Sequence, residues 1–159
     1  MQVTLSPHEM ATAAWVGVRR QVEAKRKGLP DKHGFDGDGW GSHIEGAGGE
    51  MALAKALGVY WDGGVNTFKR DDLPGIQVRT RSRHDYELLV RSADSGDEVF
   101  VLVTGQMPEY RIHGWIRGAD AKRAEWEKCH GGRPPAFFVP QGELKPMSTL
   151  RRSGCNGEA

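Results

Sequence analysis

The apolar run at residues 99–103, Val-Phe-Val-Leu-Val, constrains the fold more than any other segment. A strand with one face in water alternates apolar and polar residues, whereas a strand covered on both faces is apolar throughout. An unbroken run of this length is therefore typical of a central strand in a buried sheet. We expect a sheet with further layers of structure packed on both of its faces.

The N-terminal residues predict a long helix. Ser6, Pro7 and Glu9 combine an N-cap serine, a proline at the first helical position and a glutamate three residues after the cap. Apolar residues then recur at every fourth position, at Met10, Ala14, Val18 and Val22, with Ala11 and Trp15 beside them. The helix should end at Gly28 and Pro30, and the four periodic apolar residues should form its buried face.

The remaining segments indicate one further long helix and several strands. A glycine-rich loop at residues 31–42 precedes a helix at residues 42–57, which ends at Gly58. Strands are expected at residues 65–69, 76–82, 86–91, 110–116 and 136–140. Residues 119–130 form either a short amphipathic helix or an irregular excursion around Trp126, and residues 144–150 a weak turn or helix. This order predicts one α/β domain over residues 1–150 and a flexible tail at residues 151–159.

Charge and cysteine content exclude several classes of protein. The chain has 22 Lys and Arg against 21 Asp and Glu, a formal net charge of +1, so nucleic-acid binding would have to come from local clusters of charge. Cys129 and Cys155 form no Cys-x-x-Cys pair, which argues against a disulfide framework or a zinc knuckle. No signal-peptide pattern and no apolar run of membrane-spanning length is present, so we expect a soluble, cytoplasmic protein.

Glu50 is the most informative charged residue. Helical periodicity places an apolar face on the second helix, made of Ala47, Met51, Ala54 and Leu57. Glu50 falls on this face, between Ala54 and Leu57, whereas Glu45 falls on the opposite side, where water can solvate it. A carboxylate on an apolar face is costly unless a cation, hydrogen bonds or a metal stabilise it. Glu50 is therefore a candidate site residue, and the alternative is a buried ion pair, for example with Arg79.

Asp72 and the strand that follows supply a second set of candidates. Asp71 and Asp72 close the expected strand at residues 65–69, and a Leu-Pro-Gly turn leads into the next strand. Alternation there places Gln77 and Arg79 on one face, so Asp72 can lie beside Gln77. Oxygen donors of this kind suit a hard cation, and an arginine can hold a phosphate. The alternative is an acidic turn followed by an edge strand with a solvated polar face.

These residues together resemble the active-site layout of the PD-(D/E)XK, or restriction-endonuclease-like, nucleases. The likeness starts with a Gly-x-x-Gly-Glu-x-Ala helix at residues 46–52. Position by position, Glu50 matches the helical acid of that family, Asp72 the strand-end aspartate, Gln77 the Asp/Glu position and Arg79 the lysine position. Residues 100–105, 110–116, 138–141 and 144–146 resemble the later segments of small phage-type members, so the likeness covers roughly residues 43–150. It implies a restriction-endonuclease-like α/β fold, with a central mixed β-sheet flanked by helices.

The resemblance also implies an activity. Members of the family bind Mg²⁺, for which Mn²⁺ can substitute, and a metal-bound water attacks the phosphodiester. Glu50, Asp72 and Gln77 would be the metal ligands here, and Arg79 would offset negative charge in the transition state. Gln77 carries one negative charge fewer than an acid, and Arg79 cannot exchange a proton as a lysine does. We expect a Mg²⁺-dependent deoxyribonuclease, phage-encoded and active in the bacterial cytoplasm or associated with the virion.

Basic side chains near the expected site are the candidates for contacting DNA phosphates. They are Lys69, Arg70, Arg81 and Arg83. Other nearby side chains are Asp71 and Asp94 as further acids, His43 and His113 as proton-transfer or structural histidines, and Trp40 and Trp61 as packing residues.

Two other functions are consistent with the sequence. One is a catalytically inactive nuclease-fold module that binds DNA or a protein partner, which Gln77 and Arg79 favour. The other is a structural or assembly protein of a phage particle. A homodimer would suit double-strand cleavage, but no segment is dedicated to dimerisation, so the oligomeric state stays open.

Overall fold

The computed structural model of the chain describes residues 1–28, 39–65 and 71–151. In chain order its elements are β1 (Gln2–Thr4), α1 (Pro7–Arg26), α2 (Trp40–Leu57), β2 (Gln77–Arg81), β3 (Leu88–Arg91), β4 (Val99–Gln106), β5 (Glu109–Arg117), α3 (Gly118–Ala121), β6 (Glu127–Lys128) and β7 (Ala136–Val139). Single 3-10 turns lie at Ala124–Trp126, Gln141–Glu143 and Met147–Thr149.

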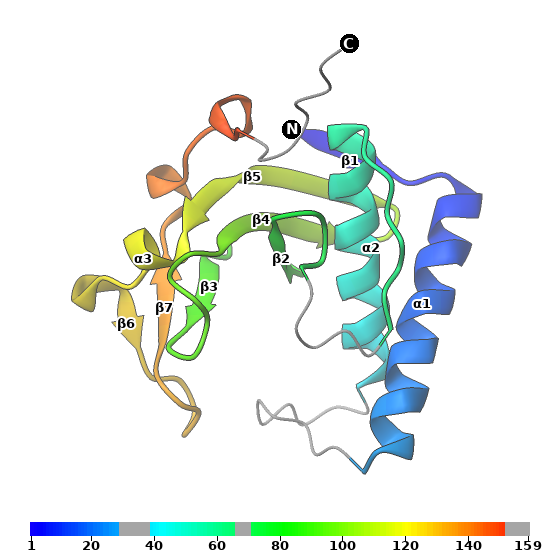
Figure 1. Cartoon of the computed structure of the whole chain (residues 1–159), viewed down its shortest axis with the longest axis horizontal. Coiled ribbons are helices and arrows are strands. Elements are labelled where there is room, and N and C mark those ends of the chain that lie inside the picture. The colour runs from blue at the N-terminus through cyan, green and yellow to red at the C-terminus, as the bar shows by residue number, and fades with distance from the viewer. Residues whose placement is uncertain (29–38, 66–70, 152–159) are drawn as a thin grey trace.

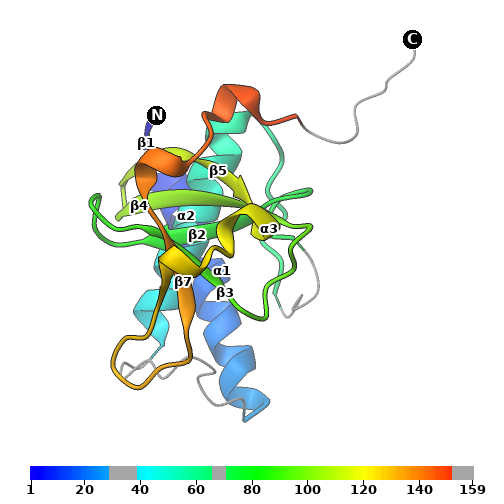
Figure 2. The ribbon, with the colours of Figure 1, turned by 90° about the vertical axis from the view of Figure 1, so that its left-hand side faces the viewer.

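The strands form two sheets. The first has the order β1-β5-β4-β2 and is mixed, because β2 runs parallel to β4 whereas β5 is antiparallel to both β1 and β4. The second has the order β3-β7-β6 and is antiparallel. Helix α2 packs on one face of the first sheet, α1 packs against α2, and the second sheet lies toward the other face of the first (Figure 1 and Figure 2). The predicted α/β class is confirmed.

Strand β4 lies between two hydrophobic cores. Val101 and Val103 belong to the core beneath α1 and α2, whereas Phe100 and Leu102 belong to the core shared with β3 and β7. All four side chains are fully buried. The prediction of a central strand covered on both faces is confirmed, and the strand extends beyond the apolar run to Gln106.

Helix α1 begins as predicted but buries a different face. The Ser6 hydroxyl accepts from Glu9 N (3.2 Å), and the Glu9 carboxylate accepts from Ser6 N (2.7 Å), which completes the capping box. The predicted buried stripe is wrong, because Val22 is 47% exposed and the neighbouring Trp15 is 64% exposed. The buried residues are instead Ala13, Val16, Gly17 and Gln21.

Close packing of the two helices explains this rotation. A Cβ added at Gly17 would lie 2.5 Å from the Cα of Ile44 in α2, so only glycine permits this approach. The face of α1 with the small residues therefore meets α2, and the face with Trp15 and Val22 is left in contact with water. Packing complementarity, and not apolar periodicity, determined the orientation of α1.

The other expected elements are largely present. Helix α2 begins two residues earlier than predicted and ends at Leu57, with Gly58 in a left-handed conformation (φ 62°). Strands β2, β3, β5 and β7 lie within one or two residues of their predicted bounds. Residues 119–130 are an excursion around Trp126, which is 7% exposed. Strands β1 and β6 were not predicted, and the strand at residues 65–69 and the tail beyond residue 151 lie outside the described residues.

No helix in residues 1–28, 39–65 and 71–151 combines the length and the apolar character that crossing a membrane requires.

Candidate functional site

Glu50 is a buried carboxylate, 6% exposed, whose two oxygens both have partners. Arg20 in α1 donates from Nη1 to Oε1 at 2.7 Å and from Nη2 to Oε2 at 2.9 Å. Trp61 donates from Nε1 to Oε2 at 3.0 Å. The buried ion pair considered for Glu50 exists, but Arg79 as its partner is wrong.

Arg20 is itself held in place from a third segment. Its Nε donates to the carbonyl oxygen of Gly64 at 2.9 Å. The guanidinium therefore links α1, α2 and the segment that follows α2. Two parallel hydrogen bonds to a carboxylate are the strongest arrangement available to an arginine. Glu50 is thus fully compensated within the protein.

Asp72 lies next to this pair at the start of β2. Its Oδ2 accepts a hydrogen bond from Val78 N at 2.7 Å, and its Oδ1 accepts none from the described residues. The pKa of Asp72 is raised to about 6, mainly by burial and then by the negative charge of Glu50, against the opposing effects of the Val78 amide, Arg79 and Arg20. Glu50 and Asp72 are therefore in electrostatic contact.

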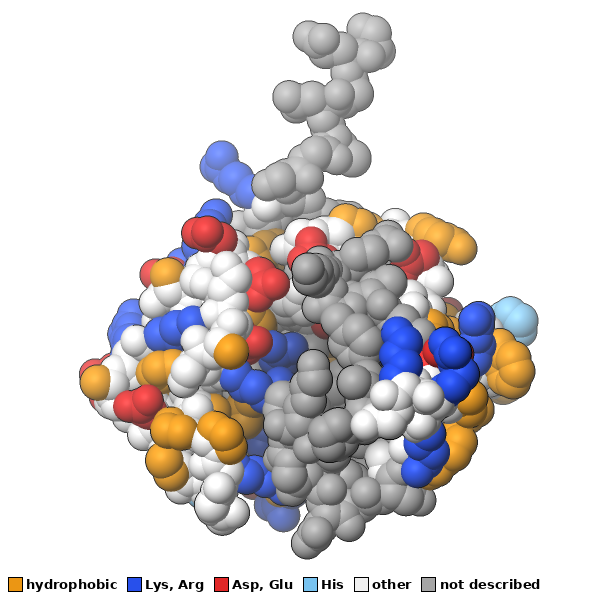
Figure 3. All heavy atoms as spheres, turned by 60° about the horizontal axis from the view of Figure 1, so that its bottom comes forward, with side chains coloured by type: hydrophobic (Ala, Val, Ile, Leu, Met, Phe, Trp, Pro, Cys, Tyr) orange, Lys and Arg blue, Asp and Glu red, His pale blue; other side chains and the backbone are white. Residues whose placement is uncertain are grey.

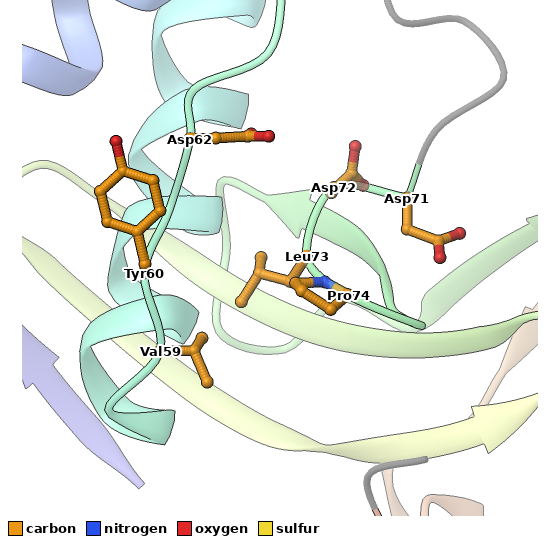
Figure 4. Close-up of a pocket in the computed structure, with 7 residues that line it drawn as sticks. All are labelled: Val59, Tyr60, Asp62, Asp71, Asp72, Leu73 and Pro74. Atoms are coloured by element: carbon orange, nitrogen blue, oxygen red, sulfur yellow. The ribbon is translucent and has the colours of Figure 1, made fainter. Parts of the chain in front are cut away.

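Asp72 also borders a pocket of about 550 Å³. One wall is formed by Val59, Tyr60 and Asp62, and the other by residues 71–74. Figure 4 shows Asp62 and Asp72 toward one end of the pocket, with Val59, Leu73 and Pro74 toward the other. The pocket thus has a carboxylate end and an apolar end.

Gln77 points to the opposite face of the sheet from Glu50. Val78 belongs to the core beneath α2, so its neighbours Gln77 and Arg79 face the second sheet. Gln77 Nε2 donates to Asp71 Oδ1 (3.2 Å) and to Glu98 Oε1 (3.3 Å). Gln77 therefore bridges two carboxylates that would otherwise repel each other.

Arg79 connects the two sheets. Its Nη2 donates to Asp94 Oδ2 at 2.8 Å, its Nε donates to the carbonyl oxygen of Leu89 in β3 at 3.3 Å, and its guanidinium lies 4.9 Å from the ring centre of Phe100. Asp94, considered above as a further acid of the site, is thus the ion-pair partner of Arg79. These contacts give Arg79 a structural role.

The four predicted residues therefore separate into two pairs around the start of β2. Glu50 and Asp72 lie on the α2 side of the sheet, whereas the side chains of Gln77 and Arg79 lie on the side of β3. The charge of Arg79 still reaches Asp72 and lowers its pKa against the larger effects of burial and Glu50.

The predicted DNA-contacting residues have protein partners where they are described. Arg81 donates to the carbonyl oxygen of Glu87 at 3.1 Å and lies 4.7 Å from the ring centre of Tyr86. Arg83 is exposed and pairs with Asp85 at 2.8 Å. Lys69 and Arg70 lie outside the described residues. Figure 3 shows Lys and Arg side chains beside a hollow, with Asp and Glu side chains among them, so both signs of charge lie on this face.

His113 contacts Thr104 and lies away from Asp72. Its Nε2 lies 2.7 Å from Thr104 Oγ1, which also lies 2.8 Å from His84 Nδ1. Burial lowers the pKa of His113, as does the nearby charge of Arg111. Thr104 lies near the end of β4, whereas Glu98 and Gln77 lie at its start, so His113 is not part of the group around Asp72.

Glu45, also on α2, has hydrogen-bond partners within the protein. The expectation that water solvates it is wrong, because it accepts from Tyr110 Oη (2.8 Å) and from Met107 N (3.3 Å). Burial raises the pKa of Tyr110, and the hydrogen bond to Glu45 raises it further.

Sequence reasoning missed Arg20 and gave Trp61 only a packing role. A signal for Arg20 was available, since it follows Ala13, Val16 and Gly17 at helical spacing on the face that contains the smallest residues of α1. Within residues 1–28, 39–65 and 71–151, no three His, Cys, Asp or Glu side chains form a group that could hold a metal ion. No protein-family model, curated protein or solved structure matches the chain.

Proposed function

We propose that the protein is a Mg²⁺-dependent nuclease that hydrolyses DNA phosphodiester bonds on a restriction-endonuclease-like fold. The resemblance of Glu50, Asp72, Gln77 and Arg79 to the motif of that family supports this activity. It also supports a phage-encoded enzyme that acts on DNA in the bacterial cytoplasm.

The observation that carries the proposal is the proximity of two carboxylates, Glu50 and Asp72. They come from α2 and from the turn before β2, and Glu50 is buried whereas Asp72 is partly buried. Arg20 pairs with Glu50 and not with Asp72, and the charge of Glu50 still raises the pKa of Asp72, so their mutual repulsion is offset only in part. Such an arrangement leaves a demand for positive charge beside Asp72.

A magnesium ion would have few protein ligands here, because Gln77 lies on the opposite face of the sheet and both oxygens of Glu50 already have partners. Mg²⁺ keeps several of its waters and is commonly bound through one or two carboxylates and the phosphates of a substrate. Asp72 would hold it through Oδ1, which accepts no hydrogen bond from the described residues, and Glu50 would contribute negative charge. The same oxygen donors would accept Mn²⁺. When bound, the ion supplies a water of lowered pKa and polarises the scissile phosphate.

The chain's own side chains would position the reacting groups. The Val78 amide orients the carboxylate of Asp72, and Arg20 with Trp61 fixes Glu50 behind it. Arg79 lies on the other face of the sheet and pairs with Asp94, so it would act on the site only through the field of its charge.

A second candidate function is a DNA-binding or protein-binding module without catalysis. It is favoured by the partners of two motif residues, because Arg20 and Trp61 occupy both oxygens of Glu50, and Asp94 with Leu89 occupies Arg79. In this case the charged residues hold the fold together, and nucleic acid would bind without a metal.

Cleavage assays separate the two. Wild type, Asp72→Asn and Glu50→Gln are incubated with plasmid and single-stranded DNA in Mg²⁺ or Mn²⁺, beside Asp85→Asn, which removes an exposed carboxylate paired with Arg83. We expect cleavage by wild type and Asp85→Asn, and its loss in the other two variants. Cleavage that persists in both site variants would reject the site. Metal-independent DNA binding without cleavage by wild type would establish the binding module.

A further inference from the structure

Tyr60 is the most exposed of the large apolar or aromatic side chains in the described residues, at 86%. It makes no hydrogen bond, ion pair or ring contact with any described residue. Single exposed apolar residues are common and need no explanation by themselves. Tyr60 differs from the exposed Trp15 of α1 because it forms part of the wall of the pocket beside Asp72.

The position of Tyr60 in this pocket is specific. Figure 4 shows the ring on one wall, with Leu73 and Pro74 on the wall opposite. Val59 adds to the apolar part of the lining, and the carboxylates of Asp62 and Asp72 lie toward the other end. A ligand that fills the pocket would therefore have a flat apolar part beside Tyr60. Its other part would lie near Asp72 and would either be positively charged or be joined to the carboxylate by a cation.

We propose that Tyr60 is a stacking platform for one nucleobase of the DNA substrate and selects unpaired DNA; this inference rests on the proposed nuclease function. A nucleotide has a planar base for Tyr60 and a phosphate that a divalent cation could join to Asp72. Every base has a face that can stack on an aromatic ring, so this contact carries no sequence preference. The carboxylate of Asp72 repels the phosphate unless a divalent cation lies between them, so binding should depend on the cation.

The substrate class follows from the same contact. A base in a duplex is already stacked and paired, and it must leave the helix before it can reach an isolated ring. A base in a single strand, a frayed end or a mismatch is available without that cost. Tyr60 therefore favours single-stranded or locally unpaired DNA over intact duplex.

The test measures binding separately from cleavage. Fluorescence anisotropy of a labelled single-stranded oligonucleotide, and of the same strand in a duplex, is recorded with wild type, Tyr60→Ala, Tyr60→Phe and Trp15→Ala in Ca²⁺, a hard cation that takes the same oxygen ligands as Mg²⁺. We expect Tyr60→Ala to weaken single-strand binding about tenfold or more. Tyr60→Phe should bind like wild type, because it keeps the ring. Trp15→Ala should also bind like wild type, because it removes an exposed ring outside the pocket.

The outcomes separate this inference from the proposed function. If wild type cleaves DNA and Asp72→Asn does not, but Tyr60→Ala binds single strands as tightly as wild type, the stacking role is overturned and the nuclease stands. Equal weakening by Tyr60→Ala and Trp15→Ala, or duplex bound as tightly as single strand, also overturns it. Spermidine is added as a probe for an organic cation. If it binds to wild type but not to Tyr60→Ala, and DNA does not bind, the pocket belongs to a cation and both proposals fail.

Discussion

The guanidinium of Arg20 and the carboxylate of Glu50 form a two-point ion pair between α1 and α2, with hydrogen bonds of 2.7 and 2.9 Å. The pair is largely shielded from water, since the two side chains are 20% and 7% exposed. A buried pair of this kind adds little stability compared with apolar residues, but removing one partner leaves an uncompensated charge. The fold of the helical layer therefore depends on both residues together.

Replacing Arg20 alone should destabilise the protein strongly. In Arg20→Met the carboxylate of Glu50 keeps only its bond from Trp61, and we expect the free energy of unfolding to fall by about 3–5 kcal/mol. Urea denaturation followed by circular dichroism measures the change. The double variant Arg20→Met/Glu50→Leu should recover most of the loss, because neither charge is then buried.

A surface arginine provides the control for this variant. Arg83→Met removes an exposed ion pair with Asp85 and should leave the denaturation midpoint unchanged. If Arg20→Met lost only about 1 kcal/mol or less, the value typical of exposed pairs, Glu50 would not depend on Arg20 as described.

Asp72 should make the stability depend on pH. Its pKa is about 6 in the folded protein, raised by burial and by Glu50, and near 4 in an unfolded chain. The folded protein thus binds this proton more tightly than the unfolded chain does. The proton's contribution to the free energy of unfolding is complete below about pH 4 and is lost as the pH rises through about 6. Asp72→Asn removes this loss and should stabilise the protein at pH 7.5 by up to about 3 kcal/mol, with no gain at pH 4.

Urea denaturation of Asp72→Asn and wild type at the two pH values measures the difference. The matched variant Asp85→Asn should show no gain at pH 7.5, because the hydrogen bond from Arg83 lowers the pKa of Asp85. An equal effect of Asp72→Asn at both pH values would contradict the raised pKa of Asp72.

Gln77→Glu should convert a stabilising bridge into a repulsive group. The new carboxylate cannot donate to Asp71 and Glu98 as the Gln77 amide does, and three negative charges would then lie together. We expect a loss of about 1–2 kcal/mol at pH 7.5 without divalent cations. Millimolar Mg²⁺ should restore much of the loss in a thermal unfolding experiment, because it binds the native state selectively.

The control for this variant is Gln141→Glu. Gln141 donates to the carbonyl oxygens of His84 and Tyr86, and no carboxylate accepts from it among the described residues. Its replacement should lower the melting temperature, and Mg²⁺ should not reverse that change. Equal recovery of both variants in Mg²⁺ would show that the ion acts through general screening.

Two glycines of α2 should respond oppositely to alanine. A Cβ at Gly49 would lie 2.0 Å from Thr80 Oγ1 in β2, so Gly49→Ala should cost about 1–3 kcal/mol despite the better helix propensity of alanine. Thr80→Ala should relieve part of this cost. Gly46→Ala meets no atom within 4 Å and should stabilise the helix by about 1 kcal/mol. Chemical denaturation of the variants tests the pair, and a neutral Gly49→Ala would contradict the close packing of α2 on β2.

Local sequence patterns predicted the elements that depend on residues close together in the chain. The cap at Ser6 and the stop at Gly58 act within one helical turn, so neighbouring residues determine them. The run at residues 99–103 predicted a doubly covered strand, because only a strand buried on both faces tolerates unbroken apolar side chains. Short strands such as β1 and β6 were missed because two or three residues carry no readable periodicity.

The sequence by itself determined that Glu50 lies on the apolar face of a helix and that Asp72 precedes a strand with alternating side chains. Only the tertiary structure decided that Arg20, 30 residues before Glu50, neutralises it and that Arg79 binds Asp94 instead. Periodicity describes one element at a time, whereas an ion pair needs two elements at a defined distance and rotation. The close approach at Gly17 set both for α1 and α2, and it could be recognised only once the helices were packed together.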